Sequence, residues 1–447
     1  MTDFPAEAGF ARNAARPRGA SGVLLGVVLT LVLMVPSFVV SVPGGPEILR
    51  STDLIGAICI GLYVMIRAQP HRLAQVERLL LAFLFASTAL ALGAFAWYAT
   101  DADNARILGY RPLLYQLRMV LILAPALLAC ALALRPETFA RLGLIFMAAA
   151  VLWICWMMFA YATGNRAYDA WQSLYQEAGN RRFYFKRLGG LIGETGHFSF
   201  HATLAFCLLM TFAFLSRLTR LGYVLVLLFP AFFAVLYLFS QARIGLITGP
   251  AVLLAIVFSG VFFSRAQRVL VGLAAGALAL APVLLQWRLE AGSLFLLRFR
   301  ALLEGDVILP EARFRGWLSS LEYLAYNPII GHGHRNVAML SGDGTENFFL
   351  AGWADFGLVI FGVLIAFLVA AVRPLFATRL SDLAVHSGAD FARAVAVMRG
   401  TVIAAFLQWQ VNDLITYFIG FPMLLFCMIY LGRIVAERNA AMAAPAR

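Results

Sequence analysis

The residues best suited to chemistry are arginines, carboxylates and histidines that lie in four short clusters. The clusters span Arg187–His201, Ser240–Gly245, Arg313–Gly333 and Thr345–Gly357. A guanidinium group makes bidentate hydrogen bonds to phosphate oxygens, so arginines at such positions suit an anionic, phosphate-bearing ligand. A carboxylate beside them can act as a general base when charge and burial tune its pKa. The clusters therefore predict a site that combines anion binding with proton transfer.

Three of the four clusters also have a simpler explanation. The first cluster, which contains Glu194, His197 and His201, is compatible with a polar cap at the entry to a helix. Arg243 lies in a tight turn, where it would equally extend toward lipid headgroups. Glu346 near a helix N-terminus is compatible with the helix dipole alone. These alternatives stay open for each of the three clusters by itself, but we expect all four clusters to lie on one side of a membrane.

Several classes of protein lack their motifs here. The chain has no Walker loop, no dinucleotide-binding glycine motif, no HExxH and no GxSxG. His332 and His334 form the closest histidine pair, and a metal site there would need a third ligand from elsewhere. The five cysteines lie in apolar runs without a CxxC pair, which is typical of core residues. We therefore predict no metal and no cofactor.

The elements that must position these clusters are membrane-spanning helices. Hydrophobic residues make up 62% of the 447 residues, and charged residues make up 13%, roughly half of the share in a soluble domain. A spanning helix needs about 20 apolar residues. The predicted fold class is therefore all-α, a polytopic membrane protein with about twelve spans. The apolar runs are 21–41, 51–66, 79–99, 113–134, 142–162, 196–215, 221–239, 244–263, 269–287, 347–372, 394–412 and 416–435.

The positions of the arginines predict the orientation. If residues 1–20 are cytoplasmic, the short inside loops are 67–78, 135–141, 217–220, 265–268 and 373–393. These loops are rich in arginine and poor in acids, as the positive-inside rule requires. Spans one to nine then occupy 21–287, spans ten to twelve occupy 347–435, and a cytoplasmic tail covers 436–447.

Two outside loops break this rule. Residues 163–195 form a basic loop, and residues 288–346 form the one long polar segment; both contain several arginines. Either the topology is wrong by one span in the middle, or these arginines bind an anionic substrate. The inside loops on both sides fit well, so we favour binding. Within the longer loop, residues 313–326 have helical spacing and are expected to lie flat on the outer membrane surface.

The order and spacing of the motifs resemble the O-antigen ligase and O-antigen polymerase superfamily of bacterial membrane glycosyltransferases. The resemblance covers roughly residues 180–435, and the first five spans match only in hydropathy. The motifs that carry it are Arg187–Gly196, Ala242–Gly245, Arg313–Trp317, Asn327–Gly333, Glu346–Leu350 and Asp355–Gly357.

The resemblance implies a metal-independent inverting enzyme of the bacterial inner membrane, with both termini cytoplasmic and 288–346 as a large periplasmic loop. Its donor would be a glycan on undecaprenyl pyrophosphate. Further partners would be membrane lipids and other polysaccharide assembly proteins, and no nucleic acid would be involved. In the family, arginines are thought to hold the pyrophosphate, which carries over to Arg187, Arg243 and Arg313. We place Glu346, Glu194, Arg243 and Arg313 in the catalytic set. Predicted substrate-binding residues are Arg187, Arg315, Trp317, His332, His334 and Asn347.

One departure from the family selects between its two activities. Ligases usually carry a histidine directly before the asparagine that corresponds to Asn347, and this chain has Glu346 there. The departure favours a polymerase of O-antigen or exopolysaccharide repeats over a ligase that transfers the glycan to the lipid A core. A transporter or flippase of an anionic lipid-linked glycan is the alternative from another class, and a structural scaffold is a third. The halves of the chain lack the similarity typical of transporters.

Overall fold

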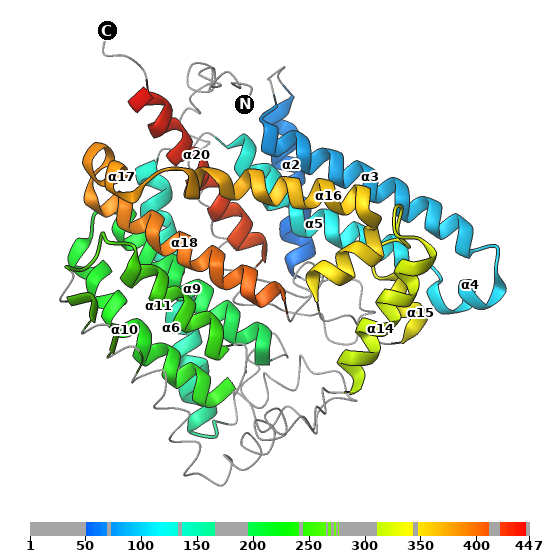
Figure 1. Ribbon diagram of the computed structural model, residues 1–447, viewed down its shortest axis with the longest axis horizontal. Helices are drawn as coiled ribbons and strands as arrows, with labels where there is room; N and C mark the ends of the chain where they lie inside the picture. Colours follow the sequence, from blue (N-terminus) through cyan, green and yellow to red (C-terminus); the bar gives the residue numbers. More distant parts are fainter. Residues whose placement is uncertain are drawn as a thin grey trace.

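The computed structural model of the chain describes residues 51–68, 73–132, 136–165, 195–240, 245–264, 267–269, 272–273, 276, 311–342, 347–410 and 421–443. Every regular element in these ranges is an α-helix, so the predicted all-α class is confirmed for this part of the chain (Figure 1). The helices are α2 (Ser51–Arg67), α3 (Gln75–Tyr98), α4 (Ala102–Leu108), α5 (Arg111–Ala131), α6 (Pro136–Ala162), α9 (Thr195–Leu215), α10 (Thr219–Ser240), α11 (Gly245–Phe258), α14 (Glu311–Tyr326), α15 (Asn336–Ser341), α16 (Phe348–Ala377), α17 (Leu380–Ser387), α18 (Ala389–Trp409) and α20 (Phe421–Ala443).

Among the described residues, six helices are long and apolar enough to cross a membrane, which makes the chain an integral membrane protein with several candidate spans. They lie in α3, α5, α6, α9, α10 and α16. Helix α2 covers the run predicted at 51–66, and α18 and α20 cover the described parts of the runs predicted at 394–412 and 416–435. However, α18 and α20 contain arginines and α2 has 17 residues. The run 21–41 and most of 269–287 lie outside the described residues. The count of twelve spans stays a prediction.

Helix α9 lies at the centre of one half of the bundle. It packs against α6, α10, α11 and α18, and nearly all of its apolar length is buried. Small residues on its neighbours permit the close approach: a Cβ added to Gly143 of α6 would lie 2.4 Å from the Phe212 ring. In membranes, where helices gain little from hydrophobic burial against each other, such close packing supplies much of the association energy.

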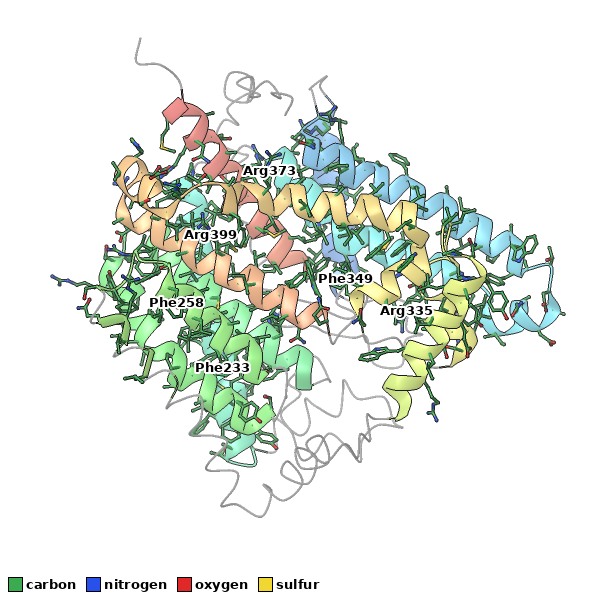
Figure 2. The ribbon with its side chains drawn as sticks, in the orientation of Figure 1. Phe233, Phe258, Arg335, Phe349, Arg373 and Arg399 are labelled. Carbon is green, nitrogen blue, oxygen red and sulfur yellow. The ribbon has the colours of Figure 1, made fainter. Side chains whose placement is uncertain are left out.

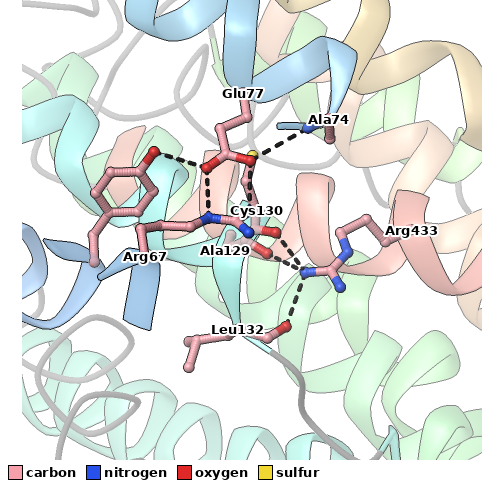
Figure 3. Close-up of polar contacts among 8 residues, drawn as sticks. Arg67, Ala74, Glu77, Ala129, Cys130, Leu132 and Arg433 are labelled. Atoms are coloured by element: carbon pink, nitrogen blue, oxygen red, sulfur yellow. Dashed lines mark hydrogen bonds and ion pairs between the residues drawn. The ribbon is translucent and has the colours of Figure 1, made fainter. Parts of the chain in front are cut away.

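One end of the bundle, called here the Glu77 end, is closed by buried hydrogen bonds (Figure 3). The Glu77 carboxylate accepts hydrogen bonds from Tyr63 Oη at 2.7 Å and from Arg67 Nη2 at 2.6 Å. It also caps its own helix by accepting from the backbone N–H of Ala74. The guanidinium of Arg433 satisfies carbonyls that the end of α5 leaves without helical partners. These carbonyls belong to Ala129, Cys130 and Leu132.

Other loops that the sequence assigns to the inside meet at the same end. Asp390 at the start of α18 accepts from Thr219 of α10 at 2.6 Å, and Arg393 donates to the carbonyl of Val261. Arg399 donates to the carbonyls of Leu375 and Thr378 near the end of α16. In Figure 2, Arg373 and Arg399 lie toward this side of the molecule, whereas Arg335 lies away from it.

Helix α16 differs from the single span predicted over 347–372. Gly357 has φ 68° and ψ 170°, so two helical segments meet there at a sharp bend (Figure 1). An apolar run does not disclose such a break, because a glycine is tolerated inside a helix at a cost of about 1 kcal/mol. At the break, α16 contacts residues 328–333, which precede it in the sequence and are separated from it by α15.

Candidate functional site

The opposite end of the bundle, called here the His332 end, carries a compact helical unit from the long loop. Helix α14 confirms the helix predicted over 313–326, and it leads through a turn at Asn327–Pro328 into the short helix α15. Gly331 adopts φ 82°, and its backbone touches the bend of α16 so closely that a Cβ would lie 2.3 Å from the backbone nitrogen of Gly357. This glycine–glycine contact places the loop directly against a candidate membrane span.

The turn supplies the hydrogen bonds that the bend removes from α16. The backbone N–H of Gly333 donates to the carbonyl of Asp355 at 2.8 Å, and the N–H of Leu358 donates to the carbonyl of Pro328 at 2.9 Å. His332 N–H also reaches the carbonyl of Asp355 at 3.1 Å. Irregular backbone at membrane depth is stable only when its polar groups are paired in this way. The turn and the broken helix therefore form one structural unit.

The imidazole of His332 fastens this unit to two helices. Its Nε2 lies 2.8 Å from the carbonyl oxygen of Tyr323, which can only accept, so Nε2 carries the proton. In the neutral ring Nδ1 then accepts from the hydroxyl of Tyr98, 3.1 Å away on α3. The Tyr323 ring packs edge-on against the imidazole, and burial raises the pKa of the Tyr323 phenol. Substrate contact by His332 stays a prediction, but both nitrogens already have partners.

His334 is buried beside Asp355. Its Nδ1 lies 3.5 Å from the carboxylate Oδ2, which also accepts the backbone N–H of Arg335 at 2.7 Å. The ring stacks on Phe356 at a centroid distance of 5.4 Å. The guanidinium of Arg335 lies 4.6 Å from the ring centroid of Tyr115 in α5, which is cation–π geometry. His334 and Arg335 thus connect the unit to the α16 bend and to α5.

A buried charge pair, Arg118 with Asp53, lies near this end and was not among the predicted site residues. Arg118 Nε lies 3.7 Å from Asp53 Oδ2, and both side chains are buried. The sequence contained a usable signal, because both residues fall inside predicted spans at 113–134 and 51–66. Charged residues inside spans are rare and pair with each other or serve function.

Asn347 caps α16 and connects it to α18. Its Oδ1 accepts the backbone N–H of Leu350 at 2.9 Å, and its Nδ2 donates to the carbonyl of Gln410 at 2.9 Å. Phe348 packs on Trp409 with ring centroids 5.1 Å apart. The first turn of α16 therefore lies against the last turn of α18.

The first turns of α9 approach the same end of α18. The Cys207 thiol contacts the Thr401 hydroxyl, and the two helices lie side by side (Figure 1). Seven residues further along each antiparallel helix, about 10 Å, Phe200 and Gln408 lie at one level. The starts of α9 and of α16 thus each lie beside the last turns of α18. In the sequence, Glu194 directly precedes α9, and Glu346 precedes the Asn347 cap.

Several buried polar atoms at the His332 end have no hydrogen-bond partner among the described residues. Gln408 is fully buried, yet both its Oε1 and Nε2 are unpaired, and so is the indole Nε1 of Trp409. Ser199 in the second turn of α9 has an unpaired Oγ, and Trp317 of α14 an unpaired Nε1. An unpaired buried polar group costs about 1–3 kcal/mol, so each of them calls for a polar occupant. Gln408, Trp409 and Ser199 were not among the site residues predicted from the sequence.

Of the other predicted site residues, some lie within the described part of the chain and some lie outside it. Arg315 is exposed on α14. Arg313 and His197 lie in the first turns of α14 and α9, but their side chains are outside the described part. The following predicted residues lie wholly outside it: Arg187, Glu194, Arg243 and Glu346. No family model and no curated protein matches the chain.

Proposed function

We propose that the protein is an integral membrane glycosyltransferase that polymerises undecaprenyl-pyrophosphate-linked oligosaccharide repeats of O-antigen or exopolysaccharide. The reaction takes place at the periplasmic face of the bacterial inner membrane. The proposal needs no metal and no cofactor, because arginines carry the charge of the pyrophosphate.

One observation carries the proposal: the first turns of α9 and the first turn of α16 each lie beside the last turns of α18, where buried hydrogen-bonding groups lack partners among the described residues. The two carboxylates suited to act as the base, Glu194 and Glu346, stand in the sequence directly before these two starts. The amide of Gln408 offers one donor group and one acceptor, which suits sugar hydroxyls that both donate and accept. A hydroxyl-rich substrate near a carboxylate base is what glycosyl transfer requires.

The chemistry is a direct displacement. A carboxylate takes the proton of the acceptor hydroxyl, whose oxygen forms a bond to the anomeric carbon of the donor sugar. The bond from that carbon to the pyrophosphate oxygen breaks, and undecaprenyl pyrophosphate leaves. Attack from the face opposite the leaving group inverts the anomeric configuration. Guanidinium groups at Arg187, Arg243 and Arg313 stabilise the charge that develops on the leaving oxygen.

The test uses purified protein in lipid with a fluorescent undecaprenyl-pyrophosphate oligosaccharide, in the presence of a chelator. We expect a ladder of products from the donor alone, and Arg243→Ala and Arg313→Ala are each expected to abolish it. Arg373→Ala is the matched control, because Arg373 is exposed and belongs to a predicted inside loop. Near-normal chain lengths from both arginine variants would contradict the site assignment.

The same assay separates the alternatives. A single transfer that requires a lipid A core acceptor would indicate a ligase, and donor movement without transfer would indicate a flippase. Glu346→Gln is expected to lower turnover more than donor binding, because a base acts on the acceptor and not on the pyrophosphate. If Glu346→Gln retains full activity, Glu194→Gln becomes the variant that should lose it.

A further inference from the structure

An exposed apolar patch surrounds the bend of α16. Ile329 and Ile330 at the tip of the turn are each 59% exposed, and Leu358 and Val359 just after the bend are 57% and 61% exposed. Trp353, before the bend, is 40% exposed. Single exposed apolar residues are ordinary, but five in direct proximity form a surface that requires an explanation.

Hydrogen bonds hold these residues together. The indole N–H of Trp353 and the backbone N–H of Leu358 both donate to the carbonyl of Pro328 at 2.9 Å. The backbone N–H of Val359 donates to the carbonyl of Ile329 at 3.4 Å. The tip of the turn therefore extends the surface of α16 itself, and that surface belongs to a candidate membrane span.

The position of the bend along α16 gives its depth. Residues 358–372 precede Arg373, which belongs to a predicted inside loop, and their rise is about 22 Å at 1.5 Å per residue. The hydrocarbon core of a bilayer is about 30 Å thick. Counted from the inner boundary, the bend and the turn beside it therefore lie within the hydrocarbon core or at its boundary with the outer headgroups.

Several polar groups of the turn are paired, as a membrane-inserted segment requires. The side chain of Asn327 accepts the backbone N–H of Ile330 at 3.3 Å and donates to the carbonyl of Gly331 at 3.0 Å. The carbonyls of Pro328 and Ile329 accept from α16, as described above. The turn thus directs polar backbone inward and isoleucine side chains outward, which is the reverse of what a water-facing loop needs.

We propose that the turn Asn327–Gly331 is a re-entrant membrane anchor, with Ile329 and Ile330 in contact with lipid acyl chains of the outer leaflet. The occupant of the patch is bilayer lipid, because the patch is continuous with the surface of a candidate span. The anchor fixes α14 and α15 at the membrane surface. This inference holds whatever reaction the protein catalyses.

Spin labels test the depth of the turn in lipid nanodiscs. Single cysteines at Ile330, Glu322 and Val369 are introduced with Cys155→Ala, because the other four native cysteines are buried. Glu322 is exposed on α14 of the same unit, and Val369 is 59% exposed within the span of α16. The Ile330 label is expected to resemble the Val369 label, with relaxation enhanced by oxygen and little affected by a water-soluble nickel chelate. Glu322 should show the opposite pattern.

Thiol reactivity gives a second readout that needs no spin label. Maleimide reacts with the thiolate, and a lipid environment raises the pKa of a thiol, so Ile330→Cys should react about tenfold or more slowly than Glu322→Cys. In detergent-free nanodiscs, equal reaction rates together with chelate access at Ile330 would overturn the anchor. They would leave the proposed glycosyltransferase activity untouched, because that proposal rests on the ends of α9, α16 and α18.

Discussion

At the residue scale, polar side chains at the His332 end divide into two groups. His332 and Asn347 use all or most of their hydrogen-bonding capacity on neighbouring helices. Gln408 and Trp317 instead carry buried polar atoms without a partner. Side chains of the first group hold the architecture, and those of the second group are available to a ligand.

Gln408→Leu provides the first prediction at this scale. Leucine has a similar size and no polar atom, so the variant should be more stable by about 1–3 kcal/mol, the cost of leaving a buried polar group unpaired. The same variant should lose polymer synthesis, because the amide is the group proposed to bind sugar hydroxyls. Thermal unfolding and the ladder assay, measured on one preparation, check both effects.

The two measurements must move in opposite directions for the proposal to stand. Thr401→Val is the matched control one helical heptad away, since Thr401 already bonds the carbonyl of Val397 at 2.9 Å. That variant removes a satisfied group, so no gain in stability is expected and activity should persist. A stabilised Gln408→Leu with unchanged activity would remove Gln408 from the site.

At the element scale, the unit α14–turn–α15 was partly predictable. Helical spacing gave α14, and Asn327–Pro328 gave the turn, because both signals are local. The bend at Gly357 and its contact with Gly331 were not predictable, since they depend on two segments meeting in space. The capping role of Asn347 follows a local rule, whereas its bond to Gln410 does not.

Gly331→Ala tests whether the close contact holds the unit in place. A Cβ at this position would lie 2.3 Å from backbone that cannot move easily, in addition to the cost of a positive φ. Gly342→Ala is the matched control, because Gly342 has φ 73° and no atom within 4 Å of an added Cβ. The control should cost about 1–2 kcal/mol and Gly331→Ala about 1–3 kcal/mol more. Thermal unfolding in nanodiscs measures the difference, and equal losses would mean that the contact is not tight in solution.

At the scale of the whole molecule, hydropathy predicted helices over most of the described chain, and arginine positions predicted which helix ends share a side. Hydropathy could not give the neighbours of each helix, because apolar surfaces look alike from the sequence. For this reason, the pairing of Arg118 in α5 with Asp53 in α2 could not be predicted. The position of α9 between α6, α10 and α18 could not be predicted either.

The two ends of the bundle differ in how their polar groups are used. At the Glu77 end, within the described residues, Arg67, Glu77, Arg433 and Asp390 make close hydrogen bonds between different helices. At the His332 end, Gln408 in the last turns of α18 has no side-chain hydrogen-bond partner among the described residues, and the starts of α9 and α16 each lie beside this part of α18. In the described part of the chain, the Glu77 end also contains buried polar atoms without a partner, such as Nε of Arg433 and Oγ of Ser216, so what distinguishes it is the set of hydrogen bonds that connect its helices.

This contrast gives the last prediction. Glu77→Leu removes the carboxylate that pairs with the partly buried Arg67, and breaking such a pair costs about 3–5 kcal/mol. The double variant Arg67→Met with Glu77→Leu should recover much of that loss, because it leaves no charge unpaired. The activity of the folded fraction should stay near that of the unmodified protein in both variants, since the Glu77 end lies away from the proposed site. Unfolding curves and turnover per folded molecule measure the two quantities. A loss of turnover in a fully folded double variant would mean that the two ends are coupled during the reaction.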